Sequence, residues 1–502
     1  MSSRSTENFD KLLIGGDLSG IQKFLYNITS KNAAVSLKGR SHYLRQYMED
    51  TCDELITRLN VEAHAVAESI YSSGGKFYII CSFSEDVIGT LACFYKEKQF
   101  AIWKEHRGGL AINFGHIPFS ENDDGTVNVE GLAQQKPSIL WKRITEDFAR
   151  QKNRKFLNVL EQSYEDFFEV TPVCAKSRVC TLTGIESDDC VKLGDGYVLP
   201  SVAEQIKIGE GLRNKEGFKT FEDYAGNSKL GILRMDVDGL GKLFASGFNT
   251  ITEYKDISAY LDRYFTSRPE KGYVSNLQAL QQQPDFKEDL NILYAGGDDI
   301  FVVGRWDKVI DFADEVRKDF AAYAQDKGLS ISGGVAIVSP KFPIAKAAEL
   351  AGEAEDIAKG YIFKDNTGKE YTKNAFCMFG QPISWQQEFD YVKEYKDAFL
   401  ENHEKGLPKG FLHKIICYSQ MAENSKRQKE MGETPNYAYV WHSSYYITRV
   451  IERIKGNDSV VAFCKKLRDQ ELYGINSADK FRLIALAARW AELTLRFTNP
   501  KQ

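Results

Sequence analysis

The sequence predicts an α+β protein with two ferredoxin-like domains, a cysteine-bearing linker domain and a C-terminal helical bundle. Three observations predict this fold class. Strand and helix patterns in the first half follow the order β-α-β-β-α-β, the second half repeats that order, and from about Trp385 apolar residues recur at helical spacing only. We therefore expect four domains, over residues 1–138, 139–215, 216–382 and 383–502.

The first half opens with an apolar strand pattern that leads directly into a helix. Residues 11–17, "KLLIGGD", have the strand pattern, and "SGIQKFLYNI" has the helical one. The patterns that follow predict a long helix from about Ser41 to Leu59, strands near 63–71 and 76–83, a helix near 85–105 and a strand at 109–117. These elements make one split β-α-β-β-α-β unit.

A basic helical stretch at 139–168 and a cysteine-bearing segment at 174–195 come before the second unit. That unit begins with the strand "KLGILRMDV". Next come helices near 250–265 and 274–283, the hairpin "DLNILYAGGDDIFVVG", a helix at 306–326, the strand "LSISGGVAIVS" and the helix "IAKAAELAGEAEDIAKG".

Two segments of the first half align with two segments of the second, which indicates a duplicated unit. "GDLSGIQKF" matches "MDVDGLGKL", and "YSSGGKFYII" matches "LYAGGDDIFVV". This alignment pairs Asp17 with Asp236, Gly74 with Gly296 and Gly75 with Gly297. It also pairs Ser19 with Asp238, and Lys76 and Phe77 with Asp298 and Asp299. The second copy thus holds four carboxylates where the first retains one, so we expect an active copy beside a degenerate one.

The carboxylates of the second copy should meet at the strand ends of the sheet. Asp236 and Asp238 share a face because side chains alternate along a strand, and the "GGDD" turn should lie beside them. Each pair of carboxylates 4 Å apart repels by about 4 kcal/mol at an effective dielectric of 20, so such a cluster needs cations. Oxygen ligands suit Mg²⁺ or Mn²⁺, and two such ions can support transfer of a phosphoryl group. Gly296 and Gly297 would let a triphosphate approach the backbone.

Two other interpretations of the "GGDD" turn were considered. Gly and Asp are common in ordinary solvated turns, but a second acidic segment in the same unit makes that interpretation weaker. A calcium loop is not supported, because no alternating acidic ligands run through a 12-residue loop here. The pattern therefore favours a two-metal site that handles phosphates.

Composition places the chain among ordinary globular proteins. It is 43% apolar and 27% charged, with a net charge of −5, so a nucleic-acid surface would have to be local. No run of 18 apolar residues and no signal-peptide pattern is present, so we expect no membrane segment. The nine cysteines are scattered, mostly through apolar stretches, which is typical of reduced thiols and predicts a cytoplasmic protein.

Six motifs in order resemble the large, polymerase-like subunit of type III CRISPR effector complexes, in its Csm-like form. They are "GDLSGIQKFLY", "LKGRSHYL", "GGKFYII", "LRMDVDGLGKLF", "LYAGGDDIFVVG" and "SISGGVAIVSPKFPIAKAAELAGEAEDIAKG". The resemblance implies that the two ferredoxin-like units are palm domains facing each other. It further implies a nucleotidyltransferase that joins ATP into cyclic oligoadenylates when the complex, with its sister subunits and guide RNA, binds target RNA.

The resemblance also implies roles for individual residues. Asp236 and Asp299 would be the principal metal ligands, with Asp298 next, and the three would form the catalytic group. A phosphate-contacting lysine is implied at Lys359. The further residues implied to bind nucleotide are Gly296, Gly297 and Asp238 in the second palm, and Asp17, Ser19, Gly74 and Gly75 in the first.

The chain also departs from the family pattern in two places. Many members carry an N-terminal HD nuclease domain, but few residues precede the first strand here and no His-Asp dipeptide occurs, so we expect no DNase activity. The segment "VCAKSRVCTLTGIESDDC" resembles a zinc ribbon that has lost a ligand. Structural zinc needs four ligands, so zinc at Cys174, Cys180 and Cys190 is not favoured.

Three alternative functions stay open at this stage. The same palm could transfer AMP from ATP to another small molecule, such as S-adenosylmethionine. The chain could be a stand-alone cyclase of the GGDEF type, although that family pairs two identical palms across a dimer. It could also be a scaffold with a vestigial site, which the intact Asp236, Asp298 and Asp299 argue against.

Overall fold

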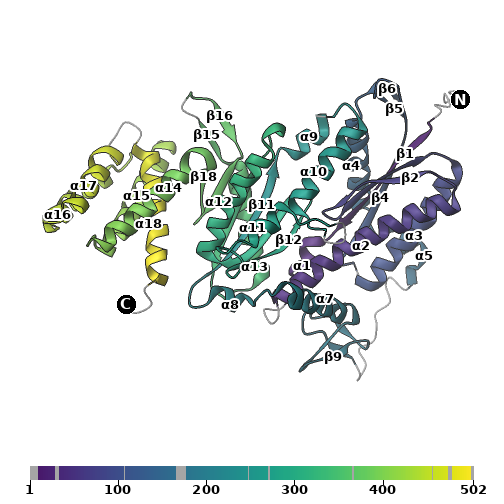
Figure 1. Ribbon diagram of the computed structural model, residues 1–502, viewed down its shortest axis with the longest axis horizontal. Coiled ribbons are helices and arrows are strands. Elements are labelled where there is room, and N and C mark those ends of the chain that lie inside the picture. Colours follow the sequence, from purple (N-terminus) through teal and green to yellow (C-terminus); the bar gives the residue numbers. More distant parts are fainter. Residues whose placement is uncertain are drawn as a thin grey trace. The chain divides into compact units, whose positions relative to one another are not determined.

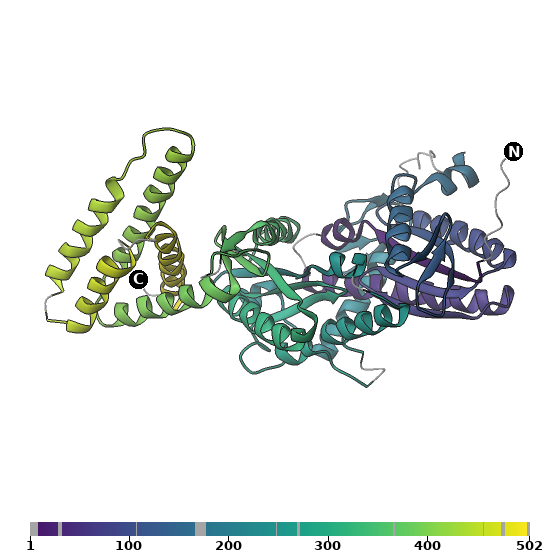
Figure 2. The same cartoon turned by 90° about the horizontal axis from the view of Figure 1, so that it is seen from above.

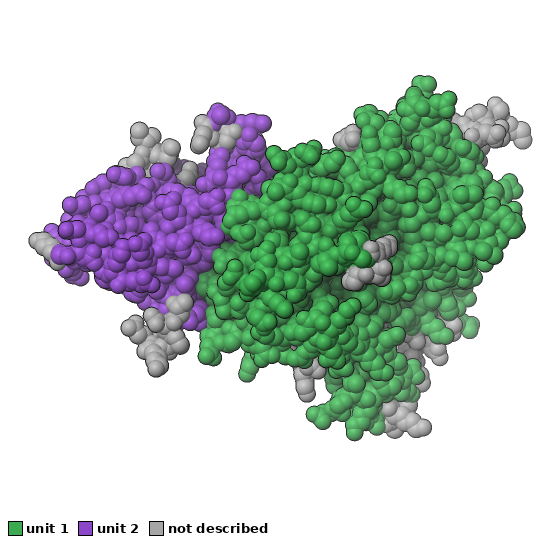
Figure 3. Space-filling model, viewed as in Figure 1, with its two compact units in different colours: residues 1–331, 336–352 green, residues 332–335, 353–502 purple. Residues whose placement is uncertain are grey.

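The computed structural model describes residues 9–28, 33–106, 108–165, 177–246, 248–268, 272–364, 367–454, 456–472 and 477–498. The chain divides into two compact units (Figure 3). Unit 1 contains Met1–Ile331 and Ala336–Gly352, and unit 2 contains Ser332–Val335 and Glu353–Gln502. The predicted α+β class with a helical C-terminal region is confirmed.

The first palm is a six-stranded sheet with β1 near its centre. The strand order is β2-β3-β1-β4-β5-β6, and β1 is antiparallel to both of its neighbours. The strands are β1 (Lys11–Ser19), β2 (Ala67–Ser73), β3 (Lys76–Ser82), β4 (Ala111–Glu121), β5 (Val127–Val129) and β6 (Leu132–Gln135). The hairpin β2–β3 therefore lies beside the first strand, as the split β-α-β-β-α-β unit predicts.

Helices cover both faces of this sheet. The helices α1 (Ile21–Tyr26), α2 (Ala33–Glu62) and α3 (Glu85–His106) belong to the face on which Leu12 and Ile14 of β1 are buried, and Figure 1 shows α2 and α3 running along the sheet. Leu13 and Gly15 face the other way, toward α4 (Ser138–Lys152). A Cβ on Gly15 would lie 2.7 Å from the Phe148 ring, so glycine lets α4 pack closely. The sequence had placed α4 in the linker domain.

The second palm repeats this arrangement within unit 1. Its strands follow the order β12-β13-β11-β14, with β11 (Leu230–Asp238), β12 (Leu290–Gly296), β13 (Asp299–Arg305) and β14 (Ser330–Val338). Its helices are α8 (Phe221–Ala225), α9 (Leu240–Ser246), α10 (Ile251–Phe265), α11 (Asn276–Gln281) and α12 (Trp306–Tyr323), followed by the short η2 (Gln325–Lys327). The order again places the hairpin next to the first strand of the unit.

The two palms share an irregularity that supports a duplication. The pairing of β2 with β3 shifts register between Ser69 and Tyr71, and the pairing of β12 with β13 shifts between Ile292 and Tyr294. Each hairpin therefore carries a bulge just before a tyrosine. The bulges align Tyr71 with Tyr294, which is one residue away from the alignment that the glycines alone suggested.

A linker lies between the palms in the sequence. It contains α5 (Leu157–Gln162), the short strands β7 (Arg178–Val179), β8 (Glu186–Ser187), β9 (Val191–Leu193) and β10 (Gly196–Val198), and α7 (Pro200–Glu216). Helix α7 crosses α2 where each has a glycine: a Cβ on Gly39 would lie 1.9 Å from the Gln205 carbonyl oxygen, and one on Gly209 would lie 2.1 Å from that of Val35. Close packing of two backbones therefore fixes α7 on the first palm.

Unit 2 joins a small sheet to the helical bundle. The middle of β14 pairs in parallel with β17 (Ala375–Met378), which pairs with β18 (Gln381–Ser384); β15 (Ile362–Lys364) pairs with β16 (Glu370–Thr372). The bundle, seen in Figure 2, contains α14 (Asp390–Glu404), α15 (Lys409–Glu430), α16 (Ala438–Arg453), α17 (Asp458–Lys466) and α18 (Ser477–Thr498), with π-turns at η3 (Trp385–Phe389) and η4 (Leu467–Glu471). Helix α13 (Ile344–Gly360) runs through both units.

None of the helices in the described part of the chain is long and apolar enough to span a bilayer.

Candidate metal and nucleotide site

Three carboxylates of the second palm converge where two strands end. Asp236 of β11 and Asp299 of β13 are direct cross-strand partners, and Asp298 stands in the turn between β12 and β13. One carboxylate oxygen of each residue lies within 4.8 Å of the others. Among the residues that the structure describes, no second group of three potential metal ligands occurs. The fold therefore brings together two segments far apart in the sequence.

The electrostatics of Asp298 show the cost of gathering these carboxylates. Burial, and after it the neighbouring charge of Asp236, raise the pKa of Asp298 to about 6 against an opposing effect of Lys76. A carboxylate with a raised pKa beside two other carboxylates is the environment that a divalent cation relieves. All three offer oxygen ligands, so the residues present fit Mg²⁺ or Mn²⁺.

Asp238, two residues after Asp236 on the same face of β11, has different surroundings. It is buried, with 6% of its surface exposed, and its Oδ2 accepts a hydrogen bond of 2.8 Å from Ser330 Oγ at the start of β14. It does not belong to the group of three ligands. Its predicted contact with nucleotide stays a prediction, and the structure shows it tying β11 to β14.

The turns of the two palms meet through glycines. Gly74 (φ 59°) and Gly297 (φ 70°) both have left-handed backbones, and a Cβ on Gly74 would lie only 3.2 Å from Gly297 Cα. The Gly297 N–H donates a hydrogen bond of 3.2 Å to Ser73 Oγ. A Cβ on Gly296, by contrast, would meet no atom closer than 3.7 Å. Gly74 and Gly297 thus serve the approach of the two turns, whereas Gly296 lines a neighbouring pocket and has room for a Cβ at ordinary contact distance from Ser73 and Tyr294.

The strand register corrects the internal alignment by one residue. Asp17 pairs with Lys76 as Asp236 pairs with Asp299, so Lys76 corresponds to Asp299 and not to Asp298. The Leu18 N–H bonds to the Gly75 carbonyl, and the Val237 N–H bonds to that of Asp298. Gly75 is therefore the counterpart of Asp298. The hairpin bulges, which precede Tyr71 and Tyr294, require the same correction.

The first palm neutralises its single strand-end carboxylate with lysines. Asp17 is buried, and its carboxylate oxygens lie 2.8 Å from Lys152 Nζ and 3.9 Å from Lys76 Nζ. Ser19 Oγ accepts a hydrogen bond of 2.7 Å from Asn113 Nδ2. Asp17 and Ser19, both predicted to contact nucleotide, therefore belong to an ordered polar network of the first palm.

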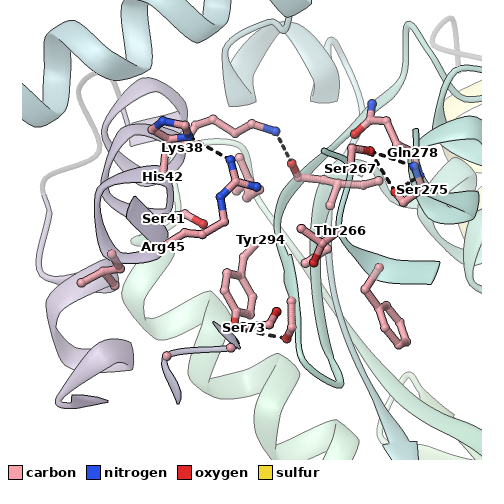
Figure 4. A pocket seen from close by; sticks show the side chains of 18 of the residues that line it. Lys38, Ser41, His42, Arg45, Ser73, Thr266, Ser267, Ser275, Gln278 and Tyr294 are labelled. Atoms are coloured by element: carbon pink, nitrogen blue, oxygen red, sulfur yellow. Dashed lines mark hydrogen bonds between the residues drawn. The ribbon is translucent and has the colours of Figure 1, made fainter. Parts of the chain in front are cut away.

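Two pockets lie on either side of the facing turns, and we call them the first and second pocket. The first pocket, of about 360 Å³, is bounded by α1 and α2 of the first palm, the turn residues Gly74 and Gly75, and β12 of the second palm. Figure 4 shows Lys38, His42 and Arg45 of α2 on one side of it, with Tyr294, Ser267 and Gln278 on the other. This volume is in the range of small-molecule sites.

The second pocket, of about 510 Å³, is the counterpart of the first with the palms exchanged. It is bounded by α9 and α10 of the second palm, the turn residues Gly297 and Asp298, and β2 and β3 of the first palm. Ile21 in the first pocket and Leu240 in the second occupy equivalent places at the start of the helix after the central strand. Trp141 and Tyr254 stack in its wall with ring centroids 3.8 Å apart.

The sequence analysis missed several residues of these pockets. Tyr71, Trp141 and Tyr254 had the signature of ordinary core aromatics, and no local pattern distinguishes an aromatic in a pocket wall from one in a core. Lys76 was visible as a substitution for an acid, but Lys152 was one of several basic residues in "ARQKNRK". Only the packing of α4 identifies it as the partner of Asp17.

Two further predictions concern Lys359 and the cysteine segment. Lys359 belongs to unit 2, where its Nζ lies 2.6 Å from Glu355 Oε1. In the cysteine segment, Cys174 is outside the described residues, and the Cys190 thiol lies 3.2 Å from the Arg178 carbonyl oxygen. Burial acts to raise the pKa of the Cys180 thiol, but hydrogen bonds, first among them that from Thr183, bring it below its ordinary value. Thr183 thus contacts the sulfur where a zinc ribbon would have its next cysteine.

Two family models match the chain, one over each of the two β-α-β-β-α-β units. A family model described as Cas10/Cmr2, second palm domain, matches residues 229–369, and one described as Csm1 subunit domain B matches residues 10–171. Two curated relatives are named CRISPR system single-strand-specific deoxyribonuclease Cas10/Csm1 (subtype III-A). That of Methanocaldococcus jannaschii is 25% identical over 79% of this chain and 62% of its own length. That of Mycobacterium tuberculosis is 27% identical over 81% and 59%. The chain thus spans about 60% of the length of these relatives.

Solved structures share the fold. A crystal structure of a Csm1-Csm4 cassette in complex with pppApApA has a TM-score of 0.63 and 20% identity, covering 97% of this chain and 71% of that one. The same cassette in complex with cA4 has a TM-score of 0.62, with 20% identity over 96% of this chain and 70% of that one.

Proposed function

We propose, from the membership of this chain in the Cas10/Csm1 family of type III CRISPR proteins, that its second palm joins ATP molecules into cyclic oligoadenylates. The activity would depend on target RNA bound by a complex with guide RNA and sister subunits. The neighbouring structures support the product class, because the cassette that shares this fold was crystallised with pppApApA and with cA4.

The observation that carries this proposal is the convergence of Asp236, Asp298 and Asp299 beside a pocket. These carboxylates would hold two divalent cations, which would supply activation of the attacking hydroxyl and stabilisation of the leaving pyrophosphate. Asp298 lines the second pocket, so a nucleotide seated there would have its phosphates next to the carboxylates. The aromatic wall formed by Trp141 and Tyr254 offers a purine a stacking surface.

The first pocket supplies the place for a second nucleotide. Because the two pockets are counterparts and share the facing turns, nucleotides in them would meet at those turns. Gly296 lines the first pocket, so its lack of a side chain would let the nucleotide there approach the backbone of the turn. The palms themselves would orient both nucleotides, and such positioning accounts for a large part of the rate acceleration by enzymes.

The partners and the related activities are also part of the proposal. The chain would work with the other subunits of a type III complex, as the Csm4 of the matched cassettes indicates for those proteins. We do not extend to it the deoxyribonuclease activity named for its relatives, of which it spans about 60%. The alternative product of the same palm is a conjugate of AMP with another small molecule.

The test is synthesis by the assembled complex. With ATP, Mg²⁺ and target RNA, we expect adenylate products by mass spectrometry, and omission of target RNA should abolish them. Replacing both Asp298 and Asp299 with Ala should abolish product while RNA binding persists; the exposed carboxylate Asp285, changed to Ala, is the matched control. Product from the double variant would contradict the site. Addition of S-adenosylmethionine, with the masses of the products, separates oligoadenylates from AMP conjugates.

A further inference from the structure

Each palm covers the edge strand of the other with a helix. β2 is an edge strand of the first sheet and α10 of the second palm packs on it, while β12 is an edge strand of the second sheet and α2 of the first palm packs on it. An edge strand presents backbone groups that have no partner within its sheet. Lys38 of α2 donates a hydrogen bond of 2.8 Å to the Ile292 carbonyl oxygen of β12. In the opposite direction, Arg268 donates one of 3.3 Å to the Ser72 carbonyl oxygen of β2.

Arg268, three residues after the end of α10, makes contacts in three directions. Its Nε lies 3.0 Å from Asp262 Oδ2 of α10, and its Nη1 lies 2.8 Å from Glu49 Oε1 of α2 in the first palm. Its Nη2 is the donor to Ser72. The side chain is 12% exposed, and its backbone is fixed as well, because its N–H and carbonyl both pair with those of Tyr273. One planar group therefore holds a helix of each palm and the end of β2 in a fixed relation.

Ser72 leads directly into the turn that meets the second palm. The next residue, Ser73, accepts the hydrogen bond of the Gly297 N–H, and a Cβ on Gly74 would lie 3.2 Å from Gly297 Cα. Asp298, which follows Gly297, belongs to the group of three carboxylates. A short path of chain and hydrogen bonds therefore leads from the guanidinium to the metal-ligand cluster, from one palm to the other.

The guanidinium of Arg268 acts on the turn and not on a pocket, since Arg268 lines neither of the two pockets. Its loss would leave in place the hydrogen bonds of Lys38 and Gly297 to the opposite palm, so the palms would shift slightly and not separate. A displacement of about 1 Å between reacting groups can cost about 10²-fold in rate. Each pocket would keep its lining residues. Transfer between the pockets is therefore more sensitive to this group than binding is.

Resting on the proposed function, we infer that Arg268 is a positioning residue for the joining of the nucleotides. Its guanidinium holds the turn of the first palm at a fixed place against Gly297, and this sets the distance between the nucleotides in the two pockets. Glu49 and Asp262 hold the guanidinium in its orientation. The rate of transfer depends on Arg268, whereas the affinity for each nucleotide depends on it little.

Steady-state kinetics of the assembled complex, with ATP, Mg²⁺ and target RNA, test this inference. Arg268→Ala should lower kcat at least 10-fold and change the KM for ATP less than about 3-fold. Arg263→Ala, at an exposed arginine of α10, is the matched control and should keep both values. Guanidinium ion at millimolar concentration should restore part of the kcat of Arg268→Ala. A residue needed only for folding would lower the amount of active complex, which titration with an ATP analogue counts, and not the kcat of each complex.

A second variant covers the case in which Arg268→Ala does not fold. Arg268→Lys keeps the charge and the aliphatic stem but cannot reach three partners at once, and its melting temperature reports folding. A kcat at least 5-fold below that of the native chain in this folded variant supports the inference. A native kcat in either folded variant, or a rise in KM as large as the fall in kcat, overturns it.

A measurement without turnover separates this inference from the proposed function. The Gly297 N–H is bonded to Ser73 across the two palms, so its hydrogen exchange reports whether the turns are held together. Exchange at Gly297 should be at least 10-fold faster in Arg268→Ala than in the native chain or in Arg263→Ala, and equal exchange would overturn the inference. A complex that makes no adenylate product would refute the proposed function and leave this measurement standing.

Discussion

At the scale of single residues, Asp298 links the acidity of the site to its affinity for metal. Burial and the charge of Asp236 raise its pKa to about 6, so the folded chain holds this proton more tightly than the unfolded chain. The stabilisation from that proton is fully present below the ordinary pKa of an aspartate and is lost as pH rises through about 6. At neutral pH the metal-free fold therefore carries an unfavourable charge.

We predict that Asp298→Asn stabilises the metal-free protein at pH 7.5. Because Asp298 is only half buried, solvent screening limits the gain to about 1 kcal/mol, or a rise in Tm of about 2–4 °C. The difference from the native chain should vanish near pH 4, and Mg²⁺ should raise the Tm of the native chain more than that of the variant, which keeps Asp236 and Asp299. Thermal melts at both pH values check this; equal responses to Mg²⁺ would contradict a metal-binding role.

Gly296 and Gly297 form a matched pair for a second prediction. Ala at Gly296 would make only ordinary contacts, the nearest at 3.7 Å, so the Tm should stay within about 1 °C. Nucleotide affinity should fall about 10-fold, because Gly296 lines the first pocket and the new Cβ would narrow it. Ala at Gly297 needs a left-handed backbone and should cost about 1–2 kcal/mol. Melts and analogue titrations on both variants separate the two roles; unchanged affinity in the first would show that Gly296 does not face the nucleotide.

The carboxylates were predictable from sequence, whereas their charge partners were not. Strand alternation and the hairpin pattern bring Asp236 and Asp299 together without any knowledge of packing. The alignment of the two copies slipped by one residue, because the bulge before Tyr71 and the one before Tyr294 are invisible in the letters. The partnership of Lys152 with Asp17 depends on where α4 packs, and long-range packing has no local signal.

At the scale of elements, the crossing of α2 and α7 connects the linker to the first pocket. Both helices carry glycine at the crossing, and the C-terminal end of α7 lines the pocket through Leu212, Lys215 and Glu216. Arg40, buried beside the crossing, donates hydrogen bonds to Gln205 of α7 and to the carbonyl oxygens of Phe24 and Asn27. It is therefore a structural anchor of the crossing.

We predict that Gly209→Ala loosens this crossing. Its Cβ would overlap the Val35 carbonyl, so the change should cost about 1–3 kcal/mol and weaken nucleotide binding in the first pocket. Gly211→Ala is the control, because its Cβ meets nothing within 4 Å and Ala favours a helix by up to about 1 kcal/mol. Chemical denaturation and analogue titration provide the measurements. If the Gly209 variant is as stable as the control, the close backbone contact does not hold α7.

The split β-α-β-β-α-β order was predictable in both halves because its strands are long and strongly apolar. Two helices show the limit: α7 was not predicted as an element, and α4 was assigned to the linker domain, whereas it packs on the first sheet. Amphipathic periodicity shows that a helix buries one face but does not say against which sheet. The linker boundary therefore required the packing itself.

At the scale of the whole molecule, both pockets lie in unit 1 and an exposed aromatic surface lies in unit 2. Helix α16 in unit 2 presents an aromatic stripe at four-residue spacing, with Tyr437, Trp441 and Tyr445 all more than half exposed. Three aromatics on one face of a helix form an apolar surface of the kind that binds a partner protein.

We predict that Trp441→Ala with Tyr445→Ala lowers incorporation of the chain into the assembled complex at least 10-fold, because the exposed rings are lost and the bundle core is not. The isolated variant should keep its Tm and its affinity for an ATP analogue, since both pockets lie in unit 1. Co-purification with the sister subunits and analytical size exclusion measure assembly. The exposed Lys414→Ala of α15 is the matched control. If the double variant assembles normally, the aromatic stripe takes no part in docking. If its affinity for the ATP analogue falls, docking and nucleotide binding are coupled.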